Sequence, residues 1–139
     1  MEIEVTATPA LQDEHFLASQ VHAFNARFMP GDFMPLAVFA RDDNGAIIGG
    51  VMGRTYWDWL DIVTLWVDET HRELGLATRL MAAAEDEARA RGCTGSLVDT
   101  FSFQALGFYR KQGYVEFGRL EGFAGGQERY YLRKALKGA

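Results

Sequence analysis

A change in hydrophobic period along the middle of the chain constrains the fold most. Ile62 to Val67 is rich in β-branched residues, which predicts a strand. Apolar residues then recur at every fourth position, which predicts a helix with one buried stripe. These residues are Leu76, Leu80, Ala84 and Ala88. Gly92 is suited to end this helix, and Gly95 to Asp99 predicts a second strand. A strand, a helix and a strand in this order predict a parallel crossover.

The residues before this unit predict a helix and a hairpin. Ile3 to Val5 alternates as a short strand should, and Leu11 to Phe28 has apolar residues on one helical face. Asn44-Gly45 is a tight-turn signal between two strand-like segments, 36–41 and 46–56. We therefore expect an antiparallel hairpin that leads into the crossover.

The residues after the crossover predict a shorter helix within Gln104 to Gly113 and two final strands, 114–120 and 129–134. On the long helix, Glu85 and Arg89 are expected to pair on the solvent side. The basic residues at the end of the chain are expected on a solvated strand face. They are Arg129, Arg133, Lys134 and Lys137. This order of elements predicts a mixed α/β sheet with helices on its faces, in a single domain over residues 1–139.

Composition excludes several classes of protein. No apolar run approaches the ~20 residues that a membrane span needs. The first residues carry two glutamates and lack the pattern of a secretory signal, so we expect a cytoplasmic chain without a membrane partner. Cys93 is the only cysteine, which excludes an internal disulfide and favours a packing role. The net charge of −5 disfavours nucleic acid as a partner.

The long helix begins without a side chain to cap it. Leu74 and Gly75 stand just ahead of Leu76, where Ser, Thr, Asp or Asn usually accepts a hydrogen bond from the first backbone N–H groups. A phosphate could accept from these donors, with Arg72 adding charge. Alternatively, water or the Thr70 hydroxyl serves this helix end.

Two segments resemble motifs of one family. "RELGLA", Arg72 to Ala77, resembles the Q/R-x-x-G-x-G/A signature of the GNAT superfamily of N-acetyltransferases. "FQALGFYRKQGY", Phe103 to Tyr114, resembles the family segment N-x-x-A-x-x-F-Y-x-x-x-G-F. The resemblance runs from about Leu36 to Lys134. It implies a mostly antiparallel sheet with one splayed parallel strand pair, with helices on both faces.

The resemblance implies an enzyme that transfers the acetyl group of acetyl-CoA to a primary amine, directly in a ternary complex. A non-catalytic acyl-CoA-binding module is the alternative, since it would keep the cofactor site and need no general acid. The acceptor, a small molecule or a peptide, is not specified by the sequence, and homodimer formation is left open. His15 and His22 could share a helix face, but no third ligand is evident, so no metal is expected.

By the same resemblance, the loop before the long helix binds the pyrophosphate of acetyl-CoA through backbone amides. The loop residues are Arg72, Glu73, Leu74, Gly75, Leu76, Ala77 and Thr78. Leu65, Trp66 and Val67 would bind the pantetheine arm and the acetyl carbonyl. Glu73 departs from the family, because many members have glycine there, and Gln104 replaces the usual asparagine.

Two residues are candidates for proton transfer. Tyr109 matches the family tyrosine that protonates the departing thiolate, although it could instead pack beside Ala105 and Phe108. Asp61 precedes Leu65 by four residues, a spacing at which the histone-acetylating branch has a glutamate. Asp61 is therefore either the general base or a residue at the wet end of the strand that pairs with Arg54. A regular strand would place Asp61, Val63, Leu65 and Val67 on one face.

The segment after the first helix is unusually apolar for a loop. In the family this region walls the acceptor site, which makes Phe28, Met29 and Phe33 candidate substrate contacts. They could equally cover the core.

Overall fold

The computed structural model describes residues 1–72 and 74–136, so Glu73 and Lys137 lie outside the described residues. The chain forms two compact units, Met1–Asp32 and Phe33–Ala139.

The first unit contains one helix, α1 (Leu11–Asn25). It ends three residues before the predicted end at Phe28. The predicted strand at Ile3 to Val5 is wrong, because these residues pair with no other strand in the described part of the chain. A three-residue segment has too few backbone hydrogen bonds to remain a strand without a partner edge.

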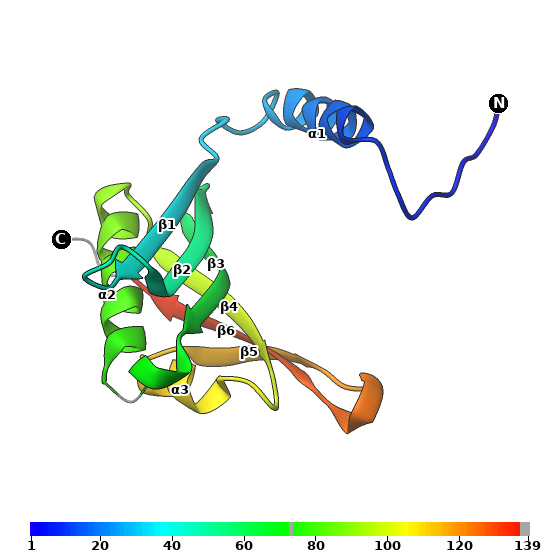
Figure 1. Cartoon of the computed structure of the whole chain (residues 1–139). Coiled ribbons are helices and arrows are strands. Elements are labelled where there is room, and N and C mark those ends of the chain that lie inside the picture. Colours follow the sequence, from blue (N-terminus) through cyan, green and yellow to red (C-terminus); the bar gives the residue numbers. More distant parts are fainter. Residues whose placement is uncertain (73, 137–139) are drawn as a thin grey trace. The chain divides into compact units, whose positions relative to one another are not determined.

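The second unit contains a sheet of six strands in the order β1-β2-β3-β4-β6-β5 (Figure 1). The strands are β1 (Met34–Arg41), β2 (Ile47–Tyr56), β3 (Trp59–Val67), β4 (Gly95–Phe101), β5 (Val115–Leu120) and β6 (Arg129–Ala135). Neighbouring strands are antiparallel except β3 and β4, which are parallel. The predicted hairpin and the parallel crossover are confirmed.

Two tight turns set the register of the first three strands. Gly45 has a φ of +83° in the turn between β1 and β2, as the Asn-Gly signal predicts. The turn between β2 and β3 places Trp57 at φ 47° and Asp58 at φ 69°. A left-handed backbone is rare for a residue as bulky as tryptophan, so Trp57 is held there by its surroundings.

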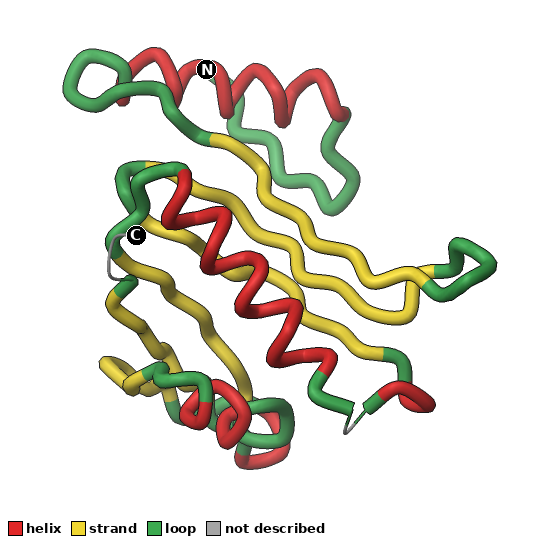
Figure 2. Tube along the Cα trace, turned by 90° about the vertical axis from the view of Figure 1, so that its left-hand side faces the viewer, coloured by secondary structure: helices red, strands yellow, loops and turns green. Residues whose placement is uncertain are grey.

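The long helix α2 (Leu76–Ala90) lies across one face of the sheet (Figure 2). A short helical turn, η1 (Glu69–His71), lies between β3 and α2 along the chain. Leu80, Ala84 and Ala88 of the predicted stripe are buried, and so is Cys93. The same core receives the short helix α3 (Leu106–Lys111) through Tyr109. A further turn, η2 (Ala124–Gly126), joins β5 to β6.

Glu85 does not lie on the solvent side of α2, which corrects the expectation. Its side chain is only 5% exposed and lies 3.9 Å from the Arg89 guanidinium. It accepts hydrogen bonds from Lys134 Nζ at 2.7 Å and from the Tyr114 hydroxyl at 2.9 Å. The Tyr114 hydroxyl also lies 2.8 Å from Ser96 Oγ of β4. A carboxylate can be buried here because a cation and a hydroxyl compensate its lost hydration.

The two central strands separate soon after they pair. The β3–β4 ladder contains only Trp59–Gly95, Leu60–Ser96 and Asp61–Leu97, and Figure 1 shows the strands diverging beyond it. A bulge in β3 coincides with the separation, because Ile62 pairs with Gly53 while Thr64 pairs with Met52. Val63 is the extra residue, and such a bulge bends its strand.

The bulge also changes which side chains share a face. Leu65 pairs with Val51, which is buried under α2, whereas Asp61 pairs with Arg54 on the opposite face. Val67 is buried, and Val63 is exposed. The expectation of one common face for Asp61, Val63, Leu65 and Val67 is therefore wrong, because the strand is not regular.

Gly53 makes room for the bulge, which gives a test of this geometry. A Cβ added to Gly53 would lie 2.3 Å from the Asp61 carbonyl oxygen, so Gly53→Ala must displace β3. We expect it to lower the free energy of unfolding in urea by about 1 to 3 kcal/mol. Gly107→Ala is the matched control, since its Cβ would meet nothing within 4 Å and alanine favours the α3 helix. Equal stability of both variants would contradict the close approach at Gly53.

Candidate active site

A pocket of about 260 Å³ lies where α2 begins, and α3 contributes one wall. It is lined by Val67, His71, Arg72, Gly75, Leu76, Ala77, Thr78 and Phe108. The structure therefore brings the predicted pyrophosphate loop together with the end of β3 and with the helix that carries Tyr109. Leu74 is exposed and does not line this pocket.

The first backbone donors of α2 face this pocket without a side-chain cap. Gly75 is the N-cap residue, with φ 73°, and no side chain of the described residues accepts a hydrogen bond there. Thr70 therefore does not serve this helix end, and its hydroxyl instead donates to the Asp68 carboxylate. Uncapped N–H groups at the positive end of a helix dipole can bind an anion such as a diphosphate.

Two basic side chains flank these donors. Arg72 donates from Nε to the Val67 carbonyl at 3.1 Å, which fixes its stem against the end of β3. His71 Nδ1 lies 3.2 Å from Asp68 Oδ2. Hydrogen bonds from Thr70 and His71 hold the pKa of Asp68 below its ordinary value. Sequence reasoning assigned no role to His71 or Asp68, although both stand beside the loop motif.

Beyond Asp61, the edge of β3 that faces β4 has no strand partner in the described part of the chain. Asp68 N–H donates to the Ile48 carbonyl at 2.8 Å, on the β2 side. Because backbone groups alternate between the two sides of a strand, the N–H groups of Leu65 and Val67 point away from β2, into the gap beside β4. Trp66 lies between them and turns its backbone groups toward β2. This edge can donate hydrogen bonds to an extended ligand.

Tyr109 lies on α3 within the core and is 5% exposed. The rings of Phe108 and Tyr114 lie 5.4 Å and 5.9 Å from its ring. Burial raises the pKa of Tyr109 to about 12, and the negative charge of Asp99 adds to this shift. Among the described residues, none forms a hydrogen bond with the Tyr109 hydroxyl. The phenol is therefore held protonated with its hydroxyl available to a ligand.

A hydrogen bond from α3 to α2 fixes Tyr109 relative to the loop. Gln112, which follows α3, donates from Nε2 to Thr78 Oγ1 at 3.1 Å. Gln104 has a local role, because its Oε1 accepts from the Phe101 N–H at 2.9 Å and so closes the turn after β4.

Asp61 lies at the last β3–β4 pair, where the strands separate. Its side chain is 15% exposed and accepts from Arg54 Nε at 3.0 Å, so the ion pair considered from the sequence is present. The carboxylate lies on the face of the sheet opposite α2, at the mouth of the gap.

The three predicted acceptor contacts are divided between the two units. Phe33 belongs to the second unit, where its ring stacks on Tyr56 at 5.8 Å and lies under the Arg54 guanidinium. Phe28 and Met29 belong to the first unit, where Phe28 packs against Phe24.

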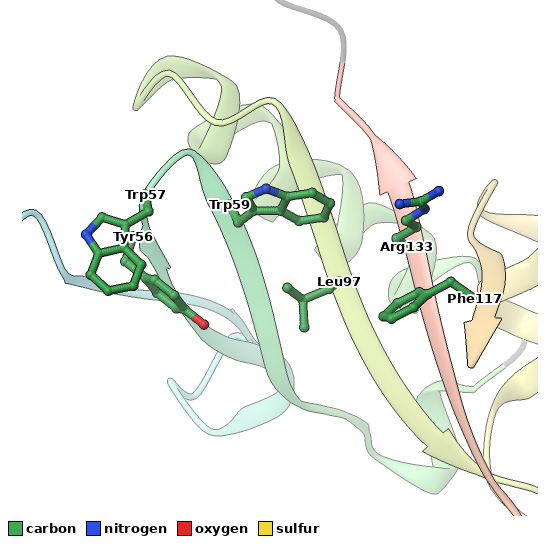
Figure 3. Close-up of a pocket in the computed structure, with 6 residues that line it drawn as sticks. All are labelled: Tyr56, Trp57, Trp59, Leu97, Phe117 and Arg133. Carbon is green, nitrogen blue, oxygen red and sulfur yellow. The ribbon is translucent and has the colours of Figure 1, made fainter. Parts of the chain in front are cut away.

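Sequence reasoning missed an aromatic hollow of about 390 Å³ on the sheet face opposite α2 (Figure 3). Its lining residues are Tyr56, Trp57, Trp59, Leu97, Phe117 and Arg133. The alternation of side chains along a strand is the signal that could have placed each of Trp59, Leu97 and Arg133 on this face. That the three lie next to one another could not be predicted without the order of the strands, because they come from β3, β4 and β6.

Among residues 1–72 and 74–136, no three metal-ligating side chains lie together as a metal would require. The helices formed by these residues are too short or too polar to span a bilayer.

Known proteins are similar to this chain in sequence and in fold. The Acetyltransferase (GNAT) family matches residues 4–114. An acetyltransferase of Agrobacterium fabrum is 39% identical over 113 residues, which are 81% of this chain and 82% of the relative. The blasticidin-S acetyltransferase of Streptomyces morookaense is 41% identical over 101 residues, which are 72% of this chain and 74% of the relative.

A solved structure agrees with the sequence matches. The crystal structure of an acetyltransferase from Agrobacterium tumefaciens superposes with a TM-score of 0.91 and 34% identity. The match covers 97% of this chain and 99% of that one. The splayed β3–β4 pair, the uncapped α2 and these matches agree, and the chain belongs to the GNAT family of acetyltransferases.

Proposed function

We propose that the protein transfers the acetyl group of acetyl-CoA to the primary amine of a small molecule, directly in a ternary complex. One observation carries this proposal: the buried Tyr109, whose hydroxyl has no hydrogen-bond partner among the described residues, lies on the helix that shares a pocket with uncapped α2. Both units would act as one domain, since the family match crosses the boundary at Asp32.

The pocket at the start of α2 would hold the pyrophosphate of acetyl-CoA. The N–H groups of Leu76, Ala77 and Thr78 would donate to its oxygens, and Arg72 would add positive charge. The pantetheine arm is an extended chain with amide groups, so it can use the unpaired edge of β3. Leu65 and Val67 would donate to it there, in the place that a neighbouring strand would otherwise occupy.

Acetyl-CoA supplies a thioester whose carbonyl carbon is open to attack by an amine. A β3 N–H would stabilise the negative charge that develops on the carbonyl oxygen, an interaction typically worth ~3 to 4 kcal/mol. As the C–N bond forms and the C–S bond breaks, Tyr109 would give its proton to the departing sulfur. The raised pKa of Tyr109 keeps this proton in place at neutral pH.

The amine must lose a proton before or during attack. Asp61 would accept it, directly or through a water molecule, because its carboxylate lies where the strands separate. Arg54 Nε donates to this carboxylate at 3.0 Å and so holds it in position at the separation. A small-molecule acceptor is supported by the relative named blasticidin-S acetyltransferase.

Tyr109→Phe tests the general acid. The variant keeps the ring in the core and removes only the proton donor, so we expect kcat to fall about 100-fold or more while acetyl-CoA affinity is kept. CoA release would be followed with a panel of primary amines. Tyr131→Phe is the matched control, since it removes a tyrosine hydroxyl from β6, and its rate should stay near that of the natural chain. Normal turnover by Tyr109→Phe would rule out the acid role.

Gly75→Val tests the pyrophosphate site. Valine is strained at a φ of 73° and would disturb the first donors of α2, so we expect the Kd for acetyl-CoA to rise about tenfold or more. Gly45→Val carries the same strain at φ 83°, in the β1–β2 turn, and serves as the control in calorimetric titrations. If both variants bind acetyl-CoA equally well, the anion site is not at α2.

A further inference from the structure

The aromatic hollow on the face opposite α2 has the form of a trough. Figure 3 shows Leu97 on its floor between the rings of Trp59 and Phe117, with Arg133 beside Phe117. Tyr56 and Trp57 lie at the end formed by the β2–β3 turn. All six lining residues belong to the second unit.

The sequence keeps this trough open. Trp59 lies over Gly95 of β4, where an added Cβ would come within 2.7 Å of the indole ring. The ring can therefore lie this close to β4 only because residue 95 is glycine. The left-handed backbone of Trp57 turns a second indole toward the same end. Backbone strain at a bulky residue is typical of ligand-binding turns.

Two other arginines on this face are paired with carboxylates. Arg54 pairs with Asp61 at 3.0 Å, and Arg129 pairs with Asp99 at 2.8 Å. Arg133 stacks over Phe117 at 5.9 Å, and no carboxylate of the described residues lies within ion-pair distance of it. In a chain with a net charge of −5, an unpaired guanidinium at the rim of an aromatic trough favours a negatively charged ligand.

The floor of the trough adjoins the place where the reaction would take place. Leu97 on its floor is the β4 partner of Asp61, and that pair is the last before the strands separate. A molecule that lies in the trough can therefore reach Asp61 and the gap between β3 and β4 with one end. Its other end would lie near Arg133, on the β5–β6 side of Leu97.

We propose that the trough binds the body of the acceptor, a primary amine that carries a planar ring and a carboxylate. The ring would lie between Trp59 and Phe117, the carboxylate would accept from Arg133, and the amine would extend to Asp61. Aromatic walls contact a planar ring over its full area, and a guanidinium pairs with a carboxylate in two parallel hydrogen bonds. This substrate class rests on the proposed acetyl transfer, whereas the binding site itself does not.

Binding of 2-naphthoate without acetyl-CoA tests the site, with 2-naphthylmethanol as the uncharged analogue. The indole N–H signals of Trp57 and Trp59 should shift in nitrogen-15 NMR spectra, and that of Trp66 should not. Arg133→Met should weaken naphthoate binding roughly fivefold or more, and naphthylmethanol binding less than about twofold. Arg41→Met is the matched control, since Arg41 is also stacked on a strand phenylalanine, Phe39, and both probes should bind as before.

Three results would overturn the proposal. They are indole signals that naphthoate leaves unchanged, an Arg133→Met variant that binds both probes equally more weakly, and an Arg133→Met variant that binds naphthoate as tightly as the natural chain does. If Arg133→Met changed the oligomeric state measured by sedimentation but kept its affinity for naphthoate, the trough would be assigned to contact with a second copy of the chain. Naphthoate binding without turnover of any aromatic amino acid or amine would support the trough and contradict acetyl transfer. Turnover with unshifted indole signals would contradict the trough alone.

Discussion

The separation of β3 from β4 is the constraint on which the rest of the structure depends. Their parallel ladder stops after Asp61–Leu97, so the sheet is divided along its middle into β1-β2-β3 and β4-β6-β5. Beyond this short ladder, the two halves lack the hydrogen bonds that normally join neighbouring strands. Beyond the ladder the two halves must therefore be joined by side chains, and the gap between them is where a ligand can complete the backbone pairing.

Helix α2 joins the two halves. Its buried stripe, Leu80, Ala84 and Ala88, packs in one core with Leu60 of β3 and Leu132 of β6. Glu85 adds a polar connection, since it accepts hydrogen bonds from Lys134 of β6 and from Tyr114, which also contacts Ser96 of β4. Removal of one partner from such a buried network leaves an uncompensated charge, so the network fixes α2 firmly over the gap.

The same arrangement places the reactive groups. Because α2 crosses the gap, its uncapped N-terminus lies beside the end of β3, and both line one pocket with Phe108 of α3. The hydrogen bond from Gln112 to Thr78 then holds α3, and with it Tyr109, next to this pocket. The separation of two strands thus accounts for the position of the anion site, the donor edge and the phenol.

Local patterns in the sequence predicted most helices and strands. They failed where the structure of a residue depends on a contact with a residue far away in the sequence. The fourfold apolar spacing of α2 and the Asn44-Gly45 turn depend on neighbouring residues alone. The bulge at Val63 depends on Gly53 of another strand, so the shared face of Asp61 and Leu65 was predicted wrongly. Burial of Glu85 depends on Lys134, and the trough depends on three strands that meet only in the folded sheet.

Amide hydrogen exchange at Leu65 and Val67, measured by NMR with and without acetyl-CoA, tests the central claim most directly. Both N–H groups lie on a central strand, yet neither has a strand partner on the β4 side, so both should exchange fast in the free protein. Saturation with acetyl-CoA should slow both amides, while Trp66, which is already bonded to β2, should change little. Slow exchange in the free protein, or exchange that acetyl-CoA leaves unchanged, would contradict the account of the gap as the donor site.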